Sequence, residues 1–320
     1  MRLPPRSVLL RGFTPSLRLA LCDATAACED GRKRWRVEDP QAAALFAKAL
    51  VASILLSAFL KGEERSILHI VCAAPDAPIR ELYSECIQLG EVRGFASGPA
   101  LARGGRAPGW DGRLGAGSLS VTRVLYGSAL PVRSTVPITA GNVEEELRSF
   151  WALSEQRGAG VVLDASAREG TGELTFAGGV LVEPLARGGG RGGDAPSEEM
   201  GAAPLPRLEG LLSAGGAPLA AAAGAYAGGA FRGAPVLRGA SAELTAGALH
   251  RVPLDFFCRC TADKFLGKLL SAASPELLDQ MAAEEVGGVA AKLECHFCNA
   301  AYTFSAAQLE SARRARPAAA

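Results

Sequence analysis

The chain has almost no net charge and very few histidines. Its 320 residues carry 34 Lys and Arg against 33 Asp and Glu, a formal net charge of +1 at pH 7. Without a field of one sign, nothing global attracts nucleic acid or an anionic membrane. The three histidines, His69, His250 and His296, show no catalytic pattern, so a histidine-centred hydrolase finds little support and we expect no enzyme.

Long apolar runs are scarce as well. The longest, residues 41–60, approaches the length of a membrane span, but Lys48 lies near its middle, where a charge is costly in lipid. We interpret it as a soluble helix with Asp39 as its cap, Pro40 at its first position and Gly62 at its C-terminal end.

No secretory signal stands out at the N-terminus. The first 22 residues contain four arginines and no acid, as transit peptides do, but residues 7–21 already have the pattern of strand, turn and strand. We therefore expect a cytoplasmic protein, with an organellar location as the open alternative.

The chain contains eight cysteines, and four of them show no ligand spacing. These four, Cys22, Cys28, Cys72 and Cys86, are scattered among apolar residues, where free cysteines are usually small buried hydrophobes. In a small secreted protein eight cysteines would suggest disulfides, but this distribution favours a reducing compartment.

The other four cysteines form two close pairs near the C-terminus. Cys258 and Cys260 form a C-x-C pair, and Cys295 and Cys298 form a C-x-x-C pair after the 34 residues from 261 to 294. Four thiolates supplied by two such pairs are a common structural zinc site. The tighter C-x-C pair must come from a sharply bent extended segment. Spacing alone leaves a purely structural zinc and a redox-active site equally open.

Composition divides the chain into three regions. We predict an α+β protein with a mixed α/β N-terminal domain over 1–185, a flexible linker rich in Gly and Ala over 186–249, and a small C-terminal zinc domain over 250–320. Within the linker, Leu205, Leu208, Leu211 and Leu212 fit a short amphipathic helix.

Periodicity and turn residues predict the elements of the two domains. For the first we expect strands over 66–73, 79–89, 118–125, 130–138, 161–164 and 173–182, a surface loop within 94–117 and a helix capped by Asn142 and Glu145. For the second we expect strands over 252–257, 289–294 and 301–304, and helices over 262–270, from Ser274-Pro275 and after Ser305, which forms a capping box with Gln308.

Three segments of the sequence resemble one known family. They are Gly115-Ala116-Gly117-Ser118-Leu119-Ser120-Val121-Thr122-Arg123, Ser154-Glu155-Gln156, and Phe257-Cys258-Arg259-Cys260 together with Cys295-His296-Phe297-Cys298-Asn299. The family is that of heat shock protein 33, the 33 kDa chaperonin, and the resemblance covers almost the whole chain. It implies an α/β domain, a linker and a C-terminal domain closed by one zinc on Cys258, Cys260, Cys295 and Cys298.

The same resemblance implies a function in the response to oxidative stress. The four cysteines would be oxidised to two disulfides, Cys258–Cys260 and Cys295–Cys298, with release of zinc. The unfolded C-terminal domain would then uncover apolar surface that holds unfolded client proteins without ATP, and the oxidised protein would be a homodimer. Two features depart from the family: the interval of 34 residues between the pairs is slightly long, and the linker has Gly and Ala in place of charged helical segments.

Two other classes remain as alternatives. The Cys295-x-x-Cys298 pair could belong to a thiol-disulfide oxidoreductase, but a thioredoxin-like motif opens a helix, and here a strand is expected to follow. A zinc-ribbon nucleic-acid binder would use Arg259, Lys264, Lys268 and Lys292, yet the chain is near neutral and only 6% aromatic. We expect His296 to face solvent or support a ligand, with four cysteines already present.

Overall fold

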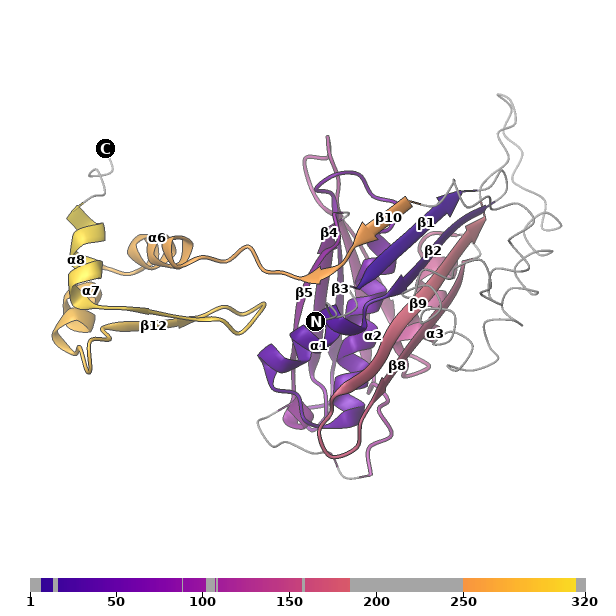
Figure 1. The fold of residues 1–320 in the computed structure, drawn as a ribbon, viewed down its shortest axis with the longest axis horizontal. Coiled ribbons are helices and arrows are strands. Elements are labelled where there is room, and N and C mark those ends of the chain that lie inside the picture. Colours follow the sequence, from indigo (N-terminus) through magenta and orange to yellow (C-terminus); the bar gives the residue numbers. More distant parts are fainter. Residues whose placement is uncertain are drawn as a thin grey trace, which may run out of the picture. The chain divides into compact units, whose positions relative to one another are not determined.

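The computed structural model of this chain describes residues 7–13, 17–87, 89–101, 107, 109–156, 159–184 and 250–314. It divides the chain into two units, Met1–Phe257 and Cys258–Ala320, which Figure 1 draws as ribbons. Helices and sheets occur in both, which confirms the predicted α+β class. The predicted linker over 186–249, with its short helix at Leu205, lies outside the described residues.

The first unit contains two sheets. The five-stranded sheet is antiparallel throughout and has the order β10-β1-β2-β9-β8, with β1 Val8–Phe13, β2 Leu17–Asp23, β8 Gly160–Ala167, β9 Leu174–Pro184 and β10 His250–Pro253. The six-stranded sheet has the order β11-β5-β4-β3-β6-β7, with β3 Arg65–Cys72, β4 Glu81–Ile87, β5 Glu91–Ser97, β6 Gly117–Val124, β7 Val132–Pro137 and β11 Asp255–Phe256. A short 3-10 helix, η1, spans Pro99–Leu101.

Helix α2, Pro40–Ser57, lies between the two sheets and contacts strands of both (Figure 1). Fourteen of its residues are buried, which requires a helix that is apolar on every side. Its length and composition would allow it to cross a membrane, but 78% of that stretch is buried inside the molecule. The apolar run that the sequence shows is therefore the central helix of this unit's core.

The start of α2 is confirmed and its predicted end is wrong. Asp39 caps it by accepting a hydrogen bond of 2.9 Å from the amide of Ala42, and Pro40 follows as expected. The helix ends at Ser57, before Gly62. Gly62 instead has a φ of +52° in the turn before β3, where a Cβ would lie 2.8 Å from the hydroxyl of Tyr126.

Helix α1, Thr25–Trp35, was not predicted from the sequence. Its N-cap residue is Ala24, which has no side chain to accept a hydrogen bond, and only Ala27, Cys28 and Gly31 are buried along it. Asp23 takes the capping role from one position earlier and accepts from the amide of Thr25 at 3.0 Å. Both sequence signals of a helix, a cap and an apolar stripe, are thus weak here.

The predicted strand over 79–89 is confirmed as β4, but the strand that follows it, β5, was not predicted. Two strands, β4 and β5, form a hairpin that turns at Gly90, which has a φ of +91°. Gly94 lies inside β5, where a Cβ would come within 2.3 Å of the Tyr83 carbonyl oxygen. The close approach of the neighbouring strand therefore requires glycine at this position. A glycine inside a strand can mark such a close approach, but it also resembles a loop signal.

The remaining predictions for this domain are confirmed within a few residues. Strands β1 and β2 pair as expected, β3 matches 66–73, and β6 and β7 flank the turn at Gly127. Helix α3, Val143–Leu153, begins after Asn142, whose side chain accepts from the amide of Glu145 at 2.8 Å. Strands β8 and β9 occupy the last two predicted positions.

Residues 250–256 lie in the first unit, although we expected the C-terminal domain to begin at 250. The predicted strand over 252–257 is two strands, of which β10 pairs with β1 and β11 pairs in parallel with β5. Leu254 and Phe256 are buried, at 2% and 5% exposure, and this burial holds the segment to the first unit. The second unit begins at Cys258.

The second unit has three helices and one hairpin in its described part. They are α6 Ala262–Ala272, α7 Pro275–Ala283, β12 Ala291–Glu294, β13 Ala301–Phe304 and α8 Ala306–Arg314. The side chains of Ser274 and Ser305 cap α7 and α8 as predicted, and Gln308 completes the capping box by accepting from the amide of Ser305 at 2.9 Å. In its described part, Ala291, Phe304 and Leu309 form a small buried cluster, and Leu278 of α7 is buried as well.

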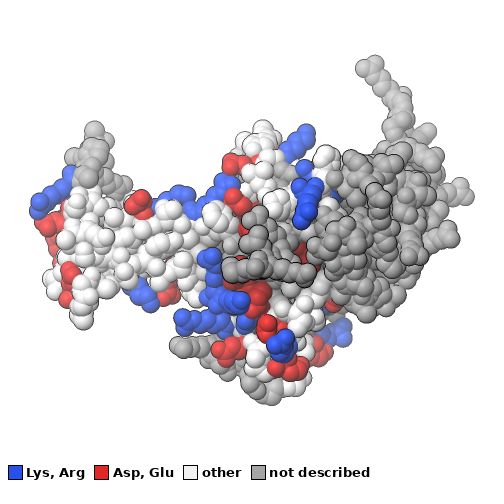
Figure 2. Space-filling view, in the orientation of Figure 1, with Lys and Arg blue, Asp and Glu red and all other residues white. Residues whose placement is uncertain are grey.

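Basic and acidic side chains are interspersed on the face of the molecule in Figure 2. Ion pairs also join opposite charges in the first unit, where Glu85 accepts from both Arg65 and Arg93, and Arg123 pairs with Glu155 at 2.7 Å. The near-zero net charge thus includes opposite charges that lie close together.

The Glu146 side chain, fully buried on α3, fixes the turn that leads into this helix. One carboxyl oxygen accepts from the amides of Thr139, Ala140 and Gly141 at 2.6–2.9 Å.

We expect Glu146→Ala to lower the free energy of unfolding by about 2–4 kcal/mol, because buried donors would lose their acceptor. Glu146→Gln, which keeps one acceptor oxygen, should lose less. All three tryptophans lie in this unit, so tryptophan fluorescence in urea measures it; equal stability of Glu146→Ala and wild type would contradict the assignment.

Candidate metal centre

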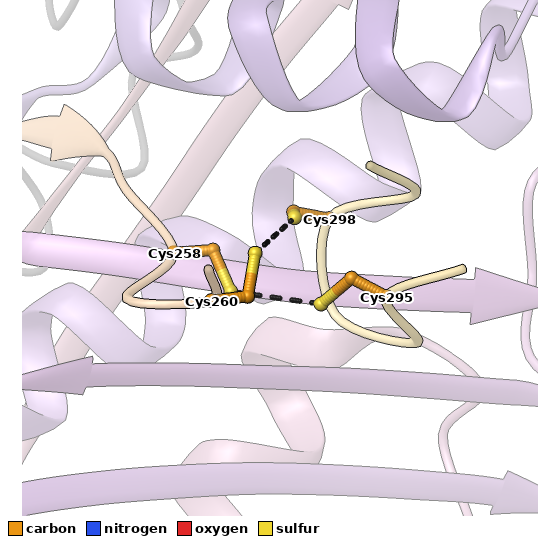
Figure 3. A group of neighbouring side chains, drawn as sticks. All are labelled: Cys258, Cys260, Cys295 and Cys298. Carbon is orange, nitrogen blue, oxygen red and sulfur yellow. Dashed lines mark hydrogen bonds between the residues drawn. The ribbon is translucent and has the colours of Figure 1, made fainter. Parts of the chain in front are cut away.

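The four C-terminal cysteines lie together in the second unit, as Figure 3 shows. All four sulfur atoms are within 4.8 Å of one another. Two contacts join the pairs, from Cys258 Sγ to Cys295 Sγ at 3.7 Å and from Cys260 Sγ to Cys298 Sγ at 3.4 Å. The tertiary structure thus brings together two segments that the sequence separates by 34 residues.

The second cysteine pair forms a tight turn between β12 and β13. Cys295 donates from its amide to the carbonyl of Ala300 at 2.8 Å, and its own carbonyl accepts from Asn299 at 2.8 Å. Asn299 has a φ of +57°, a left-handed conformation that asparagine tolerates better than most residues. Because a strand and not a helix follows this turn, the C-x-x-C pair lacks the context of a thioredoxin-like motif.

The first cysteine pair lies just before α6 in a segment with no regular helix or strand. The C-x-C spacing predicts a bent extended segment rather than a helix turn, and the pair indeed lies outside any helix. Thr261 caps that helix, and Lys264 extends back from it to donate to the carbonyl of Arg259 at 2.8 Å. The segment is therefore anchored to the first turn of α6, whose N-terminus carries a partial positive charge that favours nearby thiolates.

Tyr302 links the first pair to the hairpin of the second. Its hydroxyl oxygen lies 3.0 Å from Cys260 Sγ and donates to the Cys260 carbonyl at 3.2 Å, while its ring stacks on Phe265 with 5.0 Å between centroids. Sequence reasoning placed Tyr302 only in a strand. The alternation of β13, in which Tyr302 and Phe304 are less exposed than their neighbours, was the available signal that Tyr302 faces inward.

The four thiols do not share one electrostatic environment. Burial favours a higher pKa for Cys260, but hydrogen bonds from Tyr302 and the other three cysteines outweigh it and place this pKa below its usual value. Burial raises the pKa of Cys298 well above its usual value, and its contacts with Cys260 and Cys295 raise it further. The hydrogen bond to Cys260 likewise raises the pKa of Tyr302.

The donor set and its spacing fit a tetrahedral zinc ion. A Zn–S bond is about 2.3 Å long, which puts neighbouring sulfurs of a regular tetrahedron about 3.8 Å apart. The contacts of 3.4 and 3.7 Å are close to that separation. His296 is exposed and lies outside the four-cysteine cluster, its ring 6.0 Å from that of Phe297, in keeping with the predicted solvent-facing position.

The other four cysteines have a different environment in the first unit. Cys22, Cys28, Cys72 and Cys86 are all buried and unbridged. Burial raises the pKa of each thiol, that of Cys86 to about 12. Because the thiolate is the reactive form, these cysteines are poor nucleophiles, as their apolar sequence neighbours predict.

Comparisons with known proteins agree with this arrangement. The family model described as Hsp33 protein matches residues 9–305. The 33 kDa chaperonin of Syntrophotalea carbinolica is 29% identical to this chain, and the alignment covers 91% of this chain and 93% of the relative. The 33 kDa chaperonin of Symbiobacterium thermophilum is 31% identical, and the alignment covers 91% of this chain and 90% of the relative. The crystal structure of the 33 kDa chaperonin (heat shock protein 33 homolog) of Thermotoga maritima superposes with a TM-score of 0.72 at 22% identity, over 97% of this chain and 98% of that chain.

These findings define the class first: a chaperone with an α+β domain and a unit that carries four clustered cysteines. The chain belongs to the Hsp33 family. The resemblance noted in the three sequence segments is therefore confirmed, and the likeness to the Thermotoga maritima structure confirms the fold.

The buried thiols of the first unit should take no part in oxidant-triggered chemistry. In one variant, Cys22, Cys28, Cys72 and Cys86 are all replaced by alanine. We expect peroxide to consume the C-terminal thiols of this variant at the same rate as in wild type. Mass spectrometry of the oxidised protein provides the check. A disulfide from any of the four to a C-terminal cysteine in the native protein would contradict this expectation.

Proposed function

We propose that this chain is a redox-regulated, ATP-independent holdase whose switch is the cluster of Cys258, Cys260, Cys295 and Cys298. The observation that carries the proposal is the convergence of these four sulfurs within 4.8 Å. Membership in a chaperone family supplies the output, the binding of unfolded proteins, and the cysteines supply a group that oxidants can change.

In the reduced chain, the four cysteines would hold one zinc ion. A structural zinc site of this kind contributes an apparent folding energy of about 10–16 kcal/mol at neutral pH. The second unit has few buried apolar side chains in its described part, with Ala291, Phe304 and Leu309 forming its buried cluster, so its own core contributes little stability. We therefore propose that the cysteines keep this unit folded through their shared ligand.

Oxidation would remove the cysteines as ligands. Each disulfide forms when two thiols lose two protons and two electrons, and one hydrogen peroxide accepts them to become two waters. We propose the pairs Cys258–Cys260 and Cys295–Cys298. In the folded unit contacts of 3.4 and 3.7 Å join sulfurs of different pairs, but the two cysteines of each pair are neighbours in sequence and stay near each other after the unit opens.

Loss of the ligand set would unfold the second unit and uncover apolar surface for clients. The hydrophobic surface of a stress-unfolded protein is the expected partner, because apolar surfaces associate without a requirement for ATP. We further propose that the oxidised chain is a homodimer, that it acts in the cytoplasm, and that neither nucleic acid nor membrane is its partner. The family resemblance supports the first two proposals, and the balanced charge supports the last.

The reduced protein should contain one tightly bound zinc per chain. Cys298→Ser should weaken zinc binding, because it removes a ligand, whereas the control Cys86→Ser in the first unit should not. Metal analysis after purification and competition with a chromogenic chelator measure both quantities. A reduced protein without stoichiometric zinc, or an unchanged affinity in Cys298→Ser, would refute the proposed ligand set.

Reduced protein should suppress aggregation of a heat-unfolded model client poorly, and peroxide treatment under mildly unfolding conditions should switch suppression on. A thiol reductant with zinc should reverse the change. Light scattering of the client with reduced and oxidised protein is the measurement, in the absence of ATP. Equal protection in both states would mean a constitutive chaperone with a structural metal site, and protection in neither state would argue against holdase function.

A further inference from the structure

We propose that Tyr302 is a positioning residue that restrains the switch by donating a hydrogen bond from its hydroxyl to the sulfur of Cys260. This inference rests on the proposed function, since it assigns a regulator to the same cysteine cluster. Its basis is the contact between the hydroxyl of Tyr302, on the strand that follows the second cysteine pair, and Cys260 of the first pair.

The tyrosine hydroxyl has two acceptors within reach and one proton to donate. Its oxygen lies 3.0 Å from Cys260 Sγ and 3.2 Å from the carbonyl oxygen of the same residue. When Cys260 is a thiol, the sulfur can donate to the tyrosine oxygen while the hydroxyl donates to the carbonyl. When Cys260 is a thiolate, its sulfur can only accept, and a hydrogen bond to a charged acceptor is the stronger one.

The position of the hydroxyl is fixed by packing. The Tyr302 ring stacks on Phe265 of α6 at 5.0 Å between centroids and lies against the core of Ala291, Phe304 and Leu309. Strand pairing places Tyr302 opposite Leu293 in the β12–β13 hairpin, two residues before Cys295. The hydroxyl is therefore carried by a rigid hairpin to the C-x-C segment, which has no regular strand or helix of its own.

A hydrogen bond donated to a thiolate has two effects on a switch of this kind. It orients the ligand and holds it in place, and loss of such an outer contact typically lowers metal affinity about 10–100-fold. It also withdraws electron density from the sulfur, which slows nucleophilic attack on an oxidant such as hydrogen peroxide. In that attack the sulfur gains an oxygen and peroxide leaves as water; a second thiol then displaces a second water to form the disulfide. Both effects favour the reduced, metal-bound form of the cysteine cluster over its oxidised form.

Tyr302→Phe tests the inference because it removes the hydroxyl and keeps the ring that stacks on Phe265. We expect zinc affinity about tenfold weaker by chelator competition. The peroxide concentration that consumes half of the Cys260 thiol should shift downward, as measured by mass spectrometry. With Co²⁺ in place of zinc, the thiolate-to-cobalt charge-transfer bands should move to longer wavelength, because the sulfur is less stabilised. A packing defect alone would not produce that spectral shift.

Tyr126→Phe is the matched control. Its hydroxyl accepts from the amide of Glu63 at 2.8 Å in the first unit, so its removal should change none of the three measurements. If Tyr302→Phe binds metal with unchanged affinity, spectrum and oxidation profile, the inference is overturned while the proposed switch stands. If wild type binds no metal, both are overturned.

A measurement on wild type covers the case in which Tyr302→Phe does not fold. In the zinc-bound protein, a hydrogen-bonded hydroxyl proton of Tyr302 should exchange slowly enough with water to be observed by NMR, with a cross-relaxation contact to the Cys260 β-protons. Its detection supports the inference. Fast exchange under conditions that reveal other buried hydroxyl protons would overturn it.

Discussion

The second unit depends on the convergence of four sulfur atoms. The buried cluster of Ala291, Phe304 and Leu309 in its described part is small, an amount of apolar surface that would leave an isolated domain of this size marginal. Three capped helices and one hairpin supply local order, but they do not by themselves hold the C-x-C segment against the C-x-x-C turn. A shared ligand on the four sulfurs would make folding of the whole unit conditional on the state of the cysteines.

The same residue type has opposite chemical character in the two units. In the first, burial among apolar side chains raises the pKa of every cysteine and keeps the thiols protonated and inert. In the second, a cysteine such as Cys260 is partly exposed, contacts other sulfurs and accepts from a tyrosine hydroxyl. Environment rather than residue identity therefore divides eight cysteines into four that pack and four that can react.

The first unit differs from the second in having a large apolar core. Helix α2 fills the space between two sheets, and its apolar residues are buried on every side. Strands β10 and β11, within residues 250–256, add one strand to each sheet just before the cysteine unit begins. The chain that enters the switch is thus anchored to both sheets of a stable body.

Local signals along the chain were enough to predict several features. Helix α3 and the last two helices could be predicted because Asn142, Ser274 and Ser305 are good caps, and the two cysteine pairs could be singled out because their spacing is visible in the sequence. Helix α1 could not be predicted, because Ala24 offers no side-chain cap. Strand β5 could not be predicted either, because Gly94 resembles a loop residue in the sequence, and only the fold shows the Tyr83 carbonyl beside it.

Contacts between segments far apart in the chain could not be predicted from the sequence and became visible in the fold. The tertiary structure assigned residues 250–256 to the first unit through pairing with β1 and β5, and it brought the Tyr302 hydroxyl to Cys260 across 42 positions of sequence. The physical reason is the same in each case. Burial and hydrogen bonding between segments far apart in the chain depend on three-dimensional packing, which periodicity and spacing within one segment do not encode.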